Sequence, residues 1–100
     1  MVVEFSMFPL DKGESLGRYV ARVVNIVDKS KLPHHTCAMG TTVEGNWDEI
    51  FRLIKRCHNA LRKDCHRVYT KITVDDRKGA KNRMKGKVQS LKKILKREIM

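Results

Sequence analysis

The chain has 100 residues, 41% of them hydrophobic, which is the length and apolar content of one small domain with no room for a second core. It contains no apolar run near the roughly 20 residues that a membrane span needs, so we expect no membrane-spanning helix. The formal net charge is +11 and is uneven, because residues 1–50 hold five Lys/Arg and seven Asp/Glu whereas residues 51–100 hold seventeen and four.

The first residues and the cysteines indicate a cytoplasmic protein. Residues 1–6 have neither the basic stretch nor the small-residue cleavage site of a signal peptide. The three cysteines, Cys37, Cys57 and Cys65, are an odd number without a C-x-x-C pair, so we expect buried reduced thiols and no disulfide framework. A zinc site with nearby histidines is the alternative. It would need four converging ligands, yet Cys57 and His58 project about 100° apart on a predicted helix.

The first predicted strand covers residues 2–10, where apolar and polar side chains alternate with period two. Pro9 ends it or leaves it at a sheet edge. The alternation assigns Val3, Phe5 and Met7 to one face and Glu4, Ser6 and Phe8 to the other.

A helix follows. Asp11 and Glu14 have the spacing of a capping box, and Ser15 is the rival N-cap residue. Apolar residues within 16–27 recur at helical spacing. Residues 30–33, ending in Pro33, are expected to stop this helix.

The middle of the chain predicts a hairpin and a second helix. Strands are expected over 34–39 and 41–44, joined at Gly40, which adopts positive φ cheaply. Asn46 and Glu49 form a capping box that starts the helix. Its apolar stripe consists of Trp47, Ile50, Phe51, Ile54, Cys57 and Leu61.

Residues 68–75 alternate again and predict the last strand. A basic loop over 77–83 follows, and then a helix over about 82–97. The apolar positions of that helix are Met84, Val88, Leu91 and Leu95, and most of its other positions are lysine.

The order β-α-β-β-α-β predicts an α+β, ferredoxin-like domain over residues 1–100: a four-stranded antiparallel sheet with two helices on one face, plus a C-terminal helix. The first and third strands are expected at its centre. The helix-covered face would then carry Val3, Phe5, Met7, Val43, Val68, Ile72 and Val74. The face away from the helices would carry Glu4, Ser6, Phe8, Thr42, Glu44, Tyr69, Lys71 and Thr73. Such a mixed face suits plain solvent exposure, or a subunit contact that traps a polar ligand, which is the interpretation we favour.

Three segments resemble a known family: VEFSMFPL over 3–10, MGTTVEGNWDEI over 39–50 and ITVDDR over 72–77. The specific block M-G-T-T-V-E-G-x-W is similar to the thiamine-binding-protein family of the YkoF-like superfamily. The resemblance implies a small cytoplasmic βαββαβ protein that forms homodimers pairing into homotetramers. It also implies binding of thiamine or its hydroxymethylpyrimidine moiety, without known catalysis.

Together, the resemblance and the strand alternation imply a ligand site made of Ser6, Phe8, Met39, Thr42, Glu44 and Tyr69. Glu44 would face the ligand's amino group or its cationic ring, Thr42 and Ser6 would bond the ring edge, and Phe8 or Tyr69 would stack on it. Met39 would line the floor. Each residue also has a plain structural interpretation, as a strand-end charge, strand hydroxyl, core aromatic or hairpin contact. The same holds for Trp47 at a helix start and Arg77 in a loop.

Catalysis has little support. The motifs G-x-S-x-G, G-x-x-x-x-G-K-[ST] and H-E-x-x-H are absent, although Glu4 and Glu44 could form an acid–base pair. No cofactor is required by this interpretation. The alternatives are nucleic-acid binding through residues 77–97, which hold ten Lys/Arg, or a regulatory module for another small ligand.

Overall fold

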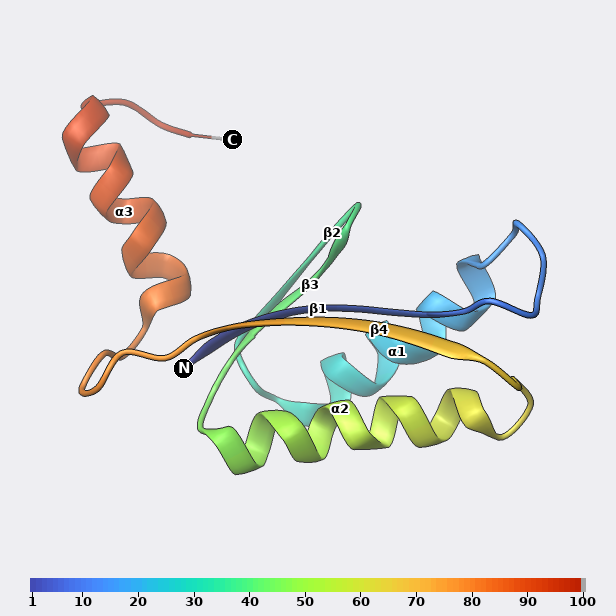
Figure 1. Ribbon diagram of the computed structural model, residues 1–100. Helices are drawn as coiled ribbons and strands as arrows, with labels where there is room; N and C mark the ends of the chain where they lie inside the picture. Colours follow the sequence, from blue (N-terminus) through green and yellow to red (C-terminus); the bar gives the residue numbers. More distant parts are fainter. Residues whose placement is uncertain (100) are drawn as a thin grey trace.

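The computed structural model describes residues 1–99 (Figure 1). Its elements follow the predicted order and are β1 (Val2–Pro9), α1 (Gly17–Ser30), β2 (His34–Cys37), β3 (Gly40–Glu44), α2 (Trp47–Arg62), β4 (Val68–Asp75) and α3 (Arg83–Leu95).

The four strands form one antiparallel sheet in the order β2-β3-β1-β4, so β1 and β3 are central as predicted. Helices α1 and α2 lie side by side on one face of this sheet (Figure 1). The arrangement confirms the ferredoxin-like α+β fold.

The core lies between the sheet and these two helices. The predicted inward side chains Val3, Phe5 and Met7 are all buried, and so is Val43, which pairs with Val3. Ile72 and Val74 share this face by register, but 38% and 39% of their surface remains exposed. The prediction that they share the covered core is therefore wrong in degree, because β4 is an edge strand and the two helices lie mainly over the rest of the sheet.

One of the two predicted capping boxes is confirmed. Asn46 Oδ1 accepts the N–H of Glu49 at 2.8 Å, and Glu49 Oε1 accepts the N–H of Asn46 at 3.1 Å. The other is wrong: α1 begins at Gly17 with no side-chain cap. The Asp11 carboxylate instead accepts the backbone N–H groups of His66 and Arg67, at 2.8 and 3.2 Å. It thereby ties the loop after β1 to the start of β4.

Gly40 begins β3 and is not a positive-φ turn residue, contrary to the prediction. The turn lies at residues 38–39. A Cβ at Gly40 would lie 3.0 Å from the carbonyl oxygen of Phe5, so the position favours glycine because the backbones of the neighbouring strands β1 and β3 approach closely there.

Two of the three cysteines are buried as expected, Cys57 and Cys65, but Cys37 is exposed on the edge strand β2. Burial raises the pKa of the Cys57 thiol to about 11, so this thiol stays protonated and behaves as a small apolar side chain. Within residues 1–99, no three His, Cys, Asp or Glu side chains come together in a way that could hold a metal ion.

Helix α3 stands away from the rest of the chain, on the opposite side of the sheet from α1 and α2 (Figure 1). None of its residues is buried. No helix within residues 1–99 is both long and apolar enough to cross a membrane.

Candidate functional site

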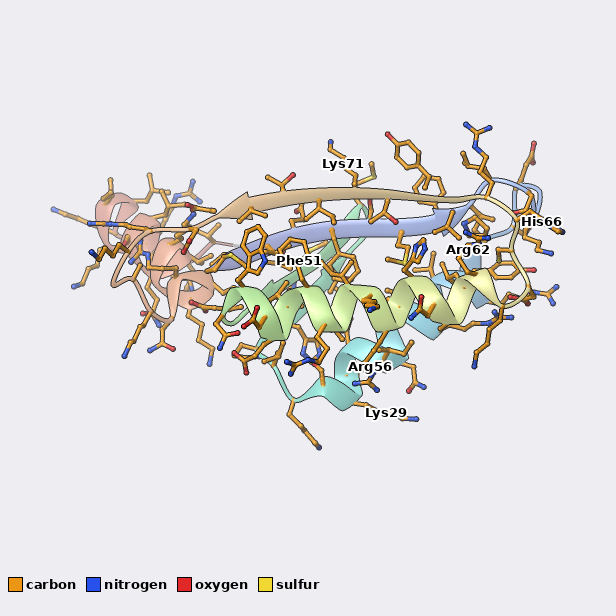
Figure 2. All side chains as sticks on the ribbon, turned by 60° about the horizontal axis from the view of Figure 1, so that its bottom comes forward. Lys29, Phe51, Arg56, Arg62, His66 and Lys71 are labelled. Atoms are coloured by element: carbon orange, nitrogen blue, oxygen red, sulfur yellow. The ribbon has the colours of Figure 1, made fainter. Side chains whose placement is uncertain are left out.

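The sheet face that points away from α1 and α2, here called the open face, has Glu4 near its centre. Glu4 lies on β1 directly opposite Thr42 of β3 and Thr73 of β4. Two residues further along β1, Ser6 lies opposite Lys71. Figure 2 shows Lys71 pointing away from the side that α2 covers. Around its centre, the open face therefore gathers the Glu4 carboxylate, several hydroxyls and the Lys71 ammonium group.

An aromatic pair forms one end of the open face. Phe8 of β1 and Tyr69 of β4 are paired in register, with ring centroids 5.5 Å apart and planes tilted by 35°. Tyr69 is 51% exposed, so part of its ring is free to contact a flat molecule. The Tyr69 ring is thus accessible for the predicted stacking, and both rings lie on the predicted face.

Glu44 lies at the opposite end of the same face, across from Val2. Its two carboxylate oxygens accept the backbone N–H groups of Arg83 at 2.7 Å and Met84 at 3.3 Å. From Val2 to Phe8 the strand rises roughly 20 Å. The structure therefore does not bring Glu44 to the aromatic pair, and the six predicted residues do not form one compact pocket.

Met39 is 87% exposed at the tip of the β2–β3 hairpin. Together with Ser6 and Phe8 it lines a hollow of about 270 Å³ beside α1. The hollow exists because β3 pairs with β1 only as far as Phe5, which leaves the second half of β1 without a strand on that side. Its walls are mainly apolar, with Val20, Val23 and Val24 of α1 among them.

A larger hollow of about 680 Å³ lies between the β3–α2 turn and the loop that follows β4. Trp47 and Arg77 both line it, and the Trp47 ring stacks on Phe51 with centroids 4.4 Å apart. Two of its carboxylates, those of Glu44 and Glu49, are already bonded to backbone N–H groups. Trp47 thus packs on Phe51 at the start of α2 and also borders the hollow, which offers few free acceptors for a ring edge.

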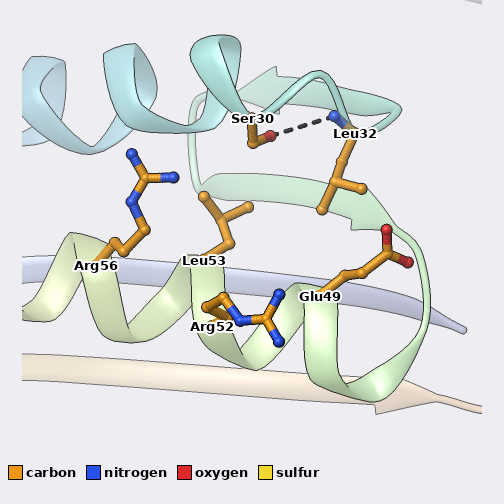
Figure 3. Close-up of a pocket in the computed structure, with 6 residues that line it drawn as sticks. All are labelled: Ser30, Leu32, Glu49, Arg52, Leu53 and Arg56. Carbon is orange, nitrogen blue, oxygen red and sulfur yellow. Dashed lines mark hydrogen bonds between the residues drawn. The ribbon is translucent and has the colours of Figure 1, made fainter.

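A third hollow, of about 180 Å³, lies between the helices and is shown in Figure 3. Its hydroxyl, from Ser30, accepts the N–H of Leu32 at 3.2 Å and donates to the carbonyl oxygen of Val27 at 2.6 Å. Glu49, Arg52 and Arg56 supply its remaining polar groups. The hollow therefore combines both signs of charge and, within residues 1–99, contains no aromatic ring on which a flat ligand could stack.

Sequence reasoning missed Glu4 as the carboxylate nearest to the predicted hydroxyls. Strand alternation already puts Glu4 on the same face as Ser6 and Phe8. The register that places Thr42 and Thr73 beside Glu4 could not be predicted from the sequence. The open face can accept hydrogen bonds from a ligand at Glu4, and its hydroxyl groups can donate or accept them. Tyr69 can contact a flat ring. Those are the needs of a planar heterocycle that carries an amino group or a positive charge.

Comparison with known proteins agrees with the fold. A family model described as "Thiamine-binding protein" matches residues 3–92. The UPF0045 protein MJ1052 of Methanocaldococcus jannaschii is 35% identical over 91 residues, 91% of each chain. A crystal structure of that protein aligns with a TM-score of 0.83 at 36% identity, over 90% of this chain and 93% of the other. A Thermotoga maritima protein proposed to serve thiamine biosynthesis or salvage aligns with a TM-score of 0.80, over 90% and 96% of the two chains; at 20% identity it shares the fold alone.

Proposed function

The chain belongs to the thiamine-binding protein family, and we propose that it binds thiamine or the hydroxymethylpyrimidine part of thiamine on the open face of its sheet. The observation that carries this proposal is the placement of Glu4 between Thr42 and Thr73, on the same face as the Phe8–Tyr69 pair. The face combines hydrogen-bond acceptors with an exposed aromatic ring.

The pyrimidine ring presents an amino group and ring nitrogens along one edge. In the proposed complex the Glu4 carboxylate accepts from the amino group, and the hydroxyls of Thr42 and Ser6 bond the ring edge. Hydroxyl groups suit this task because each can donate or accept as the ring nitrogen requires. Thr42 and Ser6 therefore keep the roles predicted for them, while Glu4 takes the role predicted for Glu44.

The thiazolium ring of thiamine is cationic and lies on Tyr69 in this complex. A cation over an aromatic face gains about 0.5–1 kcal/mol at an exposed site. Lys71 opposes this ring, because it lies across from Ser6 on the same face and carries the same sign of charge. The charge of Lys71 therefore disfavours thiamine and leaves the binding of the neutral hydroxymethylpyrimidine unaffected.

We also propose that the protein acts as a cytoplasmic binder and not as a catalyst, and that it works as a homodimer pairing into a homotetramer without a required cofactor. A half-exposed aromatic pair on a bare sheet face supports self-association, because burying such rings between subunits adds roughly 0.5–1.5 kcal/mol per pair beyond area burial.

Calorimetric titration of thiamine and hydroxymethylpyrimidine tests the proposal with the wild type and Glu4→Gln. Loss of a charged acceptor should weaken binding about ten- to hundredfold. Glu14→Gln is the matched control, because Glu14 is an exposed carboxylate in the loop before α1. Equal affinity in wild type and Glu4→Gln would remove the open face as the site, and no heat with either ligand would reject the function.

Nucleic-acid binding is the second candidate, supported by one observation. Residues 77–97 hold ten Lys/Arg, most of them on a loop and on α3, and α3 is fixed to the sheet at its start and then points away from it (Figure 1). Such binding would come from phosphate contacts, so it should collapse between 50 and 200 mM salt and show no preference among sequences. Salt-resistant, sequence-selective binding would make this the leading function.

A further inference from the structure

Helix α3 lacks the packing partner that a helix of its kind needs. Its apolar side chains Val88, Leu91, Ile94 and Leu95 are 41–75% exposed. A 13-residue helix is marginal in water on its own, and Gly86 within it weakens it further. Because Val88, Leu91 and Leu95 recur at helical spacing, they form a stripe that requires cover.

The chain itself holds only the start of α3. The Glu44 carboxylate accepts the N–H groups of Arg83 and Met84, and Lys87 pairs with Asp75 at the end of β4. Beyond these contacts α3 points away from its own sheet (Figure 1). The helix is thus fixed at its base and bare along its apolar stripe.

We propose that α3 of one chain packs across the open face of a second copy, that the exchange is mutual, and that each ligand site is completed by the partner's α3. The ligand part of this inference rests on the proposed function. The exchange part does not. It follows from α3 and the open face lying on the same side of the sheet, so that a two-fold axis brings each helix over the other chain's face and closes the assembly.

Charge favours the open face over a second α3 as the surface that receives the helix. Residues 83–95 contain five Lys/Arg and no acidic residue, so two α3 helices side by side would repel. The open face offers the Glu4 carboxylate, which takes part in no ion pair within residues 1–99, and the exposed ring of Tyr69 for the apolar stripe. Lys71 is its one opposing charge near these groups.

Exchange would also change the ligand site. In one chain the groups around Glu4 are open to water, which weakens every electrostatic contact they make. A helix laid over them excludes water and traps a flat ligand between Tyr69 and the apolar stripe. Ligand binding and assembly then stabilise each other, so the ligand should shift the monomer–dimer equilibrium toward the dimer.

The first test measures assembly. Leu91→Asp places a charge in the apolar stripe, and Gln89→Asp places the same charge on the same helix away from the stripe. Sedimentation velocity should show Leu91→Asp shifted to monomer at concentrations where wild type and Gln89→Asp are associated. Equal association of all three proteins would overturn the inference.

The second test asks which chain supplies the helix. Wild-type chains labelled with ¹⁴N and ¹⁵N are mixed, allowed to re-equilibrate, and treated with a zero-length carbodiimide that joins lysine to carboxylate. Links between α3 lysines and Glu4 should include peptide pairs of unlike isotope. If every such link joins peptides of the same isotope, α3 folds back on its own sheet and the exchange is refuted.

The third test couples exchange to the ligand. Glu4→Gln has an impaired site and an intact helix, whereas Leu91→Asp has an intact site and an impaired helix. With exchange, a mixed dimer holds one site with both parts intact, so the mixture should bind more ligand than either variant alone. The recovery should reach at most about a quarter of the wild-type sites, because Leu91→Asp also weakens pairing. A mixture that binds no better than its two components would show that the partner's helix does not complete the site. If the wild type binds neither ligand, the proposed function fails and the isotope test still decides the exchange.

Discussion

Glu44 Oε2 accepts the backbone N–H of Arg83 at 2.7 Å, which joins the end of β3 to the start of α3. The other oxygen of Glu44 accepts the next N–H, that of Met84. The side chain therefore does for α3 what a capping residue does from within the chain, and its negative charge lies at the positive end of the helix dipole. Asn82, the residue at the N-cap position, makes no side-chain cap bond of its own.

Glu44→Gln should loosen α3 with little effect on ligand affinity. The change removes the charge and one of two acceptors, which should cost about 1 kcal/mol at the helix start. Amide exchange at Arg83 and Met84, measured by NMR, should accelerate roughly fivefold. Glu14→Gln is the control. A large loss of thiamine affinity in Glu44→Gln, matching that in Glu4→Gln, would instead return Glu44 to the ligand site.

Asp64→Asn should lower stability at neutral pH but not in acid. The Asp64 carboxylate accepts two hydrogen bonds from Arg22, at 2.7 and 2.9 Å, and joins α1 to the segment after α2. This bidentate contact lowers the pKa of Asp64 to about 2. Since the folded pKa lies below the unfolded value, the contribution is present above about pH 4 and disappears as the pH falls through the folded pKa.

Thermal melting of wild type and Asp64→Asn from pH 7 to pH 2 checks this dependence. The gap between their melting temperatures should close as the pH approaches 2. Asp76→Asn is the matched control, because no ion pair within residues 1–99 engages Asp76. A gap that stays constant across this range would mean that the carboxylate charge is not what stabilises the contact.

Gly40→Ala should destabilise the fold. The added methyl group would lie 3.0 Å from the Phe5 carbonyl oxygen, which is backbone of a central strand and cannot move away cheaply. The expected loss is roughly 1–3 kcal/mol in the free energy of unfolding, measured by urea denaturation. Gly17→Ala is the control, since no atom outside its own helix lies within 4 Å of the added Cβ. Equal unfolding midpoints for the two variants would contradict the close-approach explanation.

The fold was readable from the sequence wherever the signal is local or repeats with a fixed period. Alternation assigned Val3 and Phe5 to the core correctly, and the Asn46–Glu49 spacing located the start of α2. Asp11 failed because its carboxylate bonds to backbone groups 55 and 56 residues away instead of those of the helix beside it. A capping pattern shows that a side chain seeks N–H donors, but not which ones the tertiary structure brings to it.

For the candidate site, the sequence predicted which face of the sheet each residue occupies but not how far apart the residues lie. Alternation places Glu4, Ser6 and Glu44 on one face, and the structure agrees. Their separation along that face depends on register, which the strand pattern leaves open. The register sets Glu44 opposite Val2 and Tyr69 opposite Phe8, at the two ends of β1. Equally, the apolar stripe of α3 was visible in the sequence, but its distance from the chain's own sheet was not.

Lys71→Met should separate the two proposed ligands. The Lys71 ammonium lies on the open face across from Ser6, close to where the thiazolium ring would rest on Tyr69. Two unit charges about 7 Å apart in water repel by roughly 0.6 kcal/mol, so removing the ammonium should improve thiamine affinity about threefold. Hydroxymethylpyrimidine is neutral and should bind the variant and the wild type equally.

Calorimetry at low salt measures the effect, because screening at high salt would hide it. Lys55→Met is the matched control, an exposed lysine on α2 in the helical layer, and it should change neither affinity. If Lys71→Met improves both ligands equally, the gain comes from added apolar surface. If it improves neither, the thiazolium ring does not lie near Tyr69. Only a gain confined to thiamine supports the orientation in which the pyrimidine ring points to Glu4 and the cationic ring to the aromatic pair.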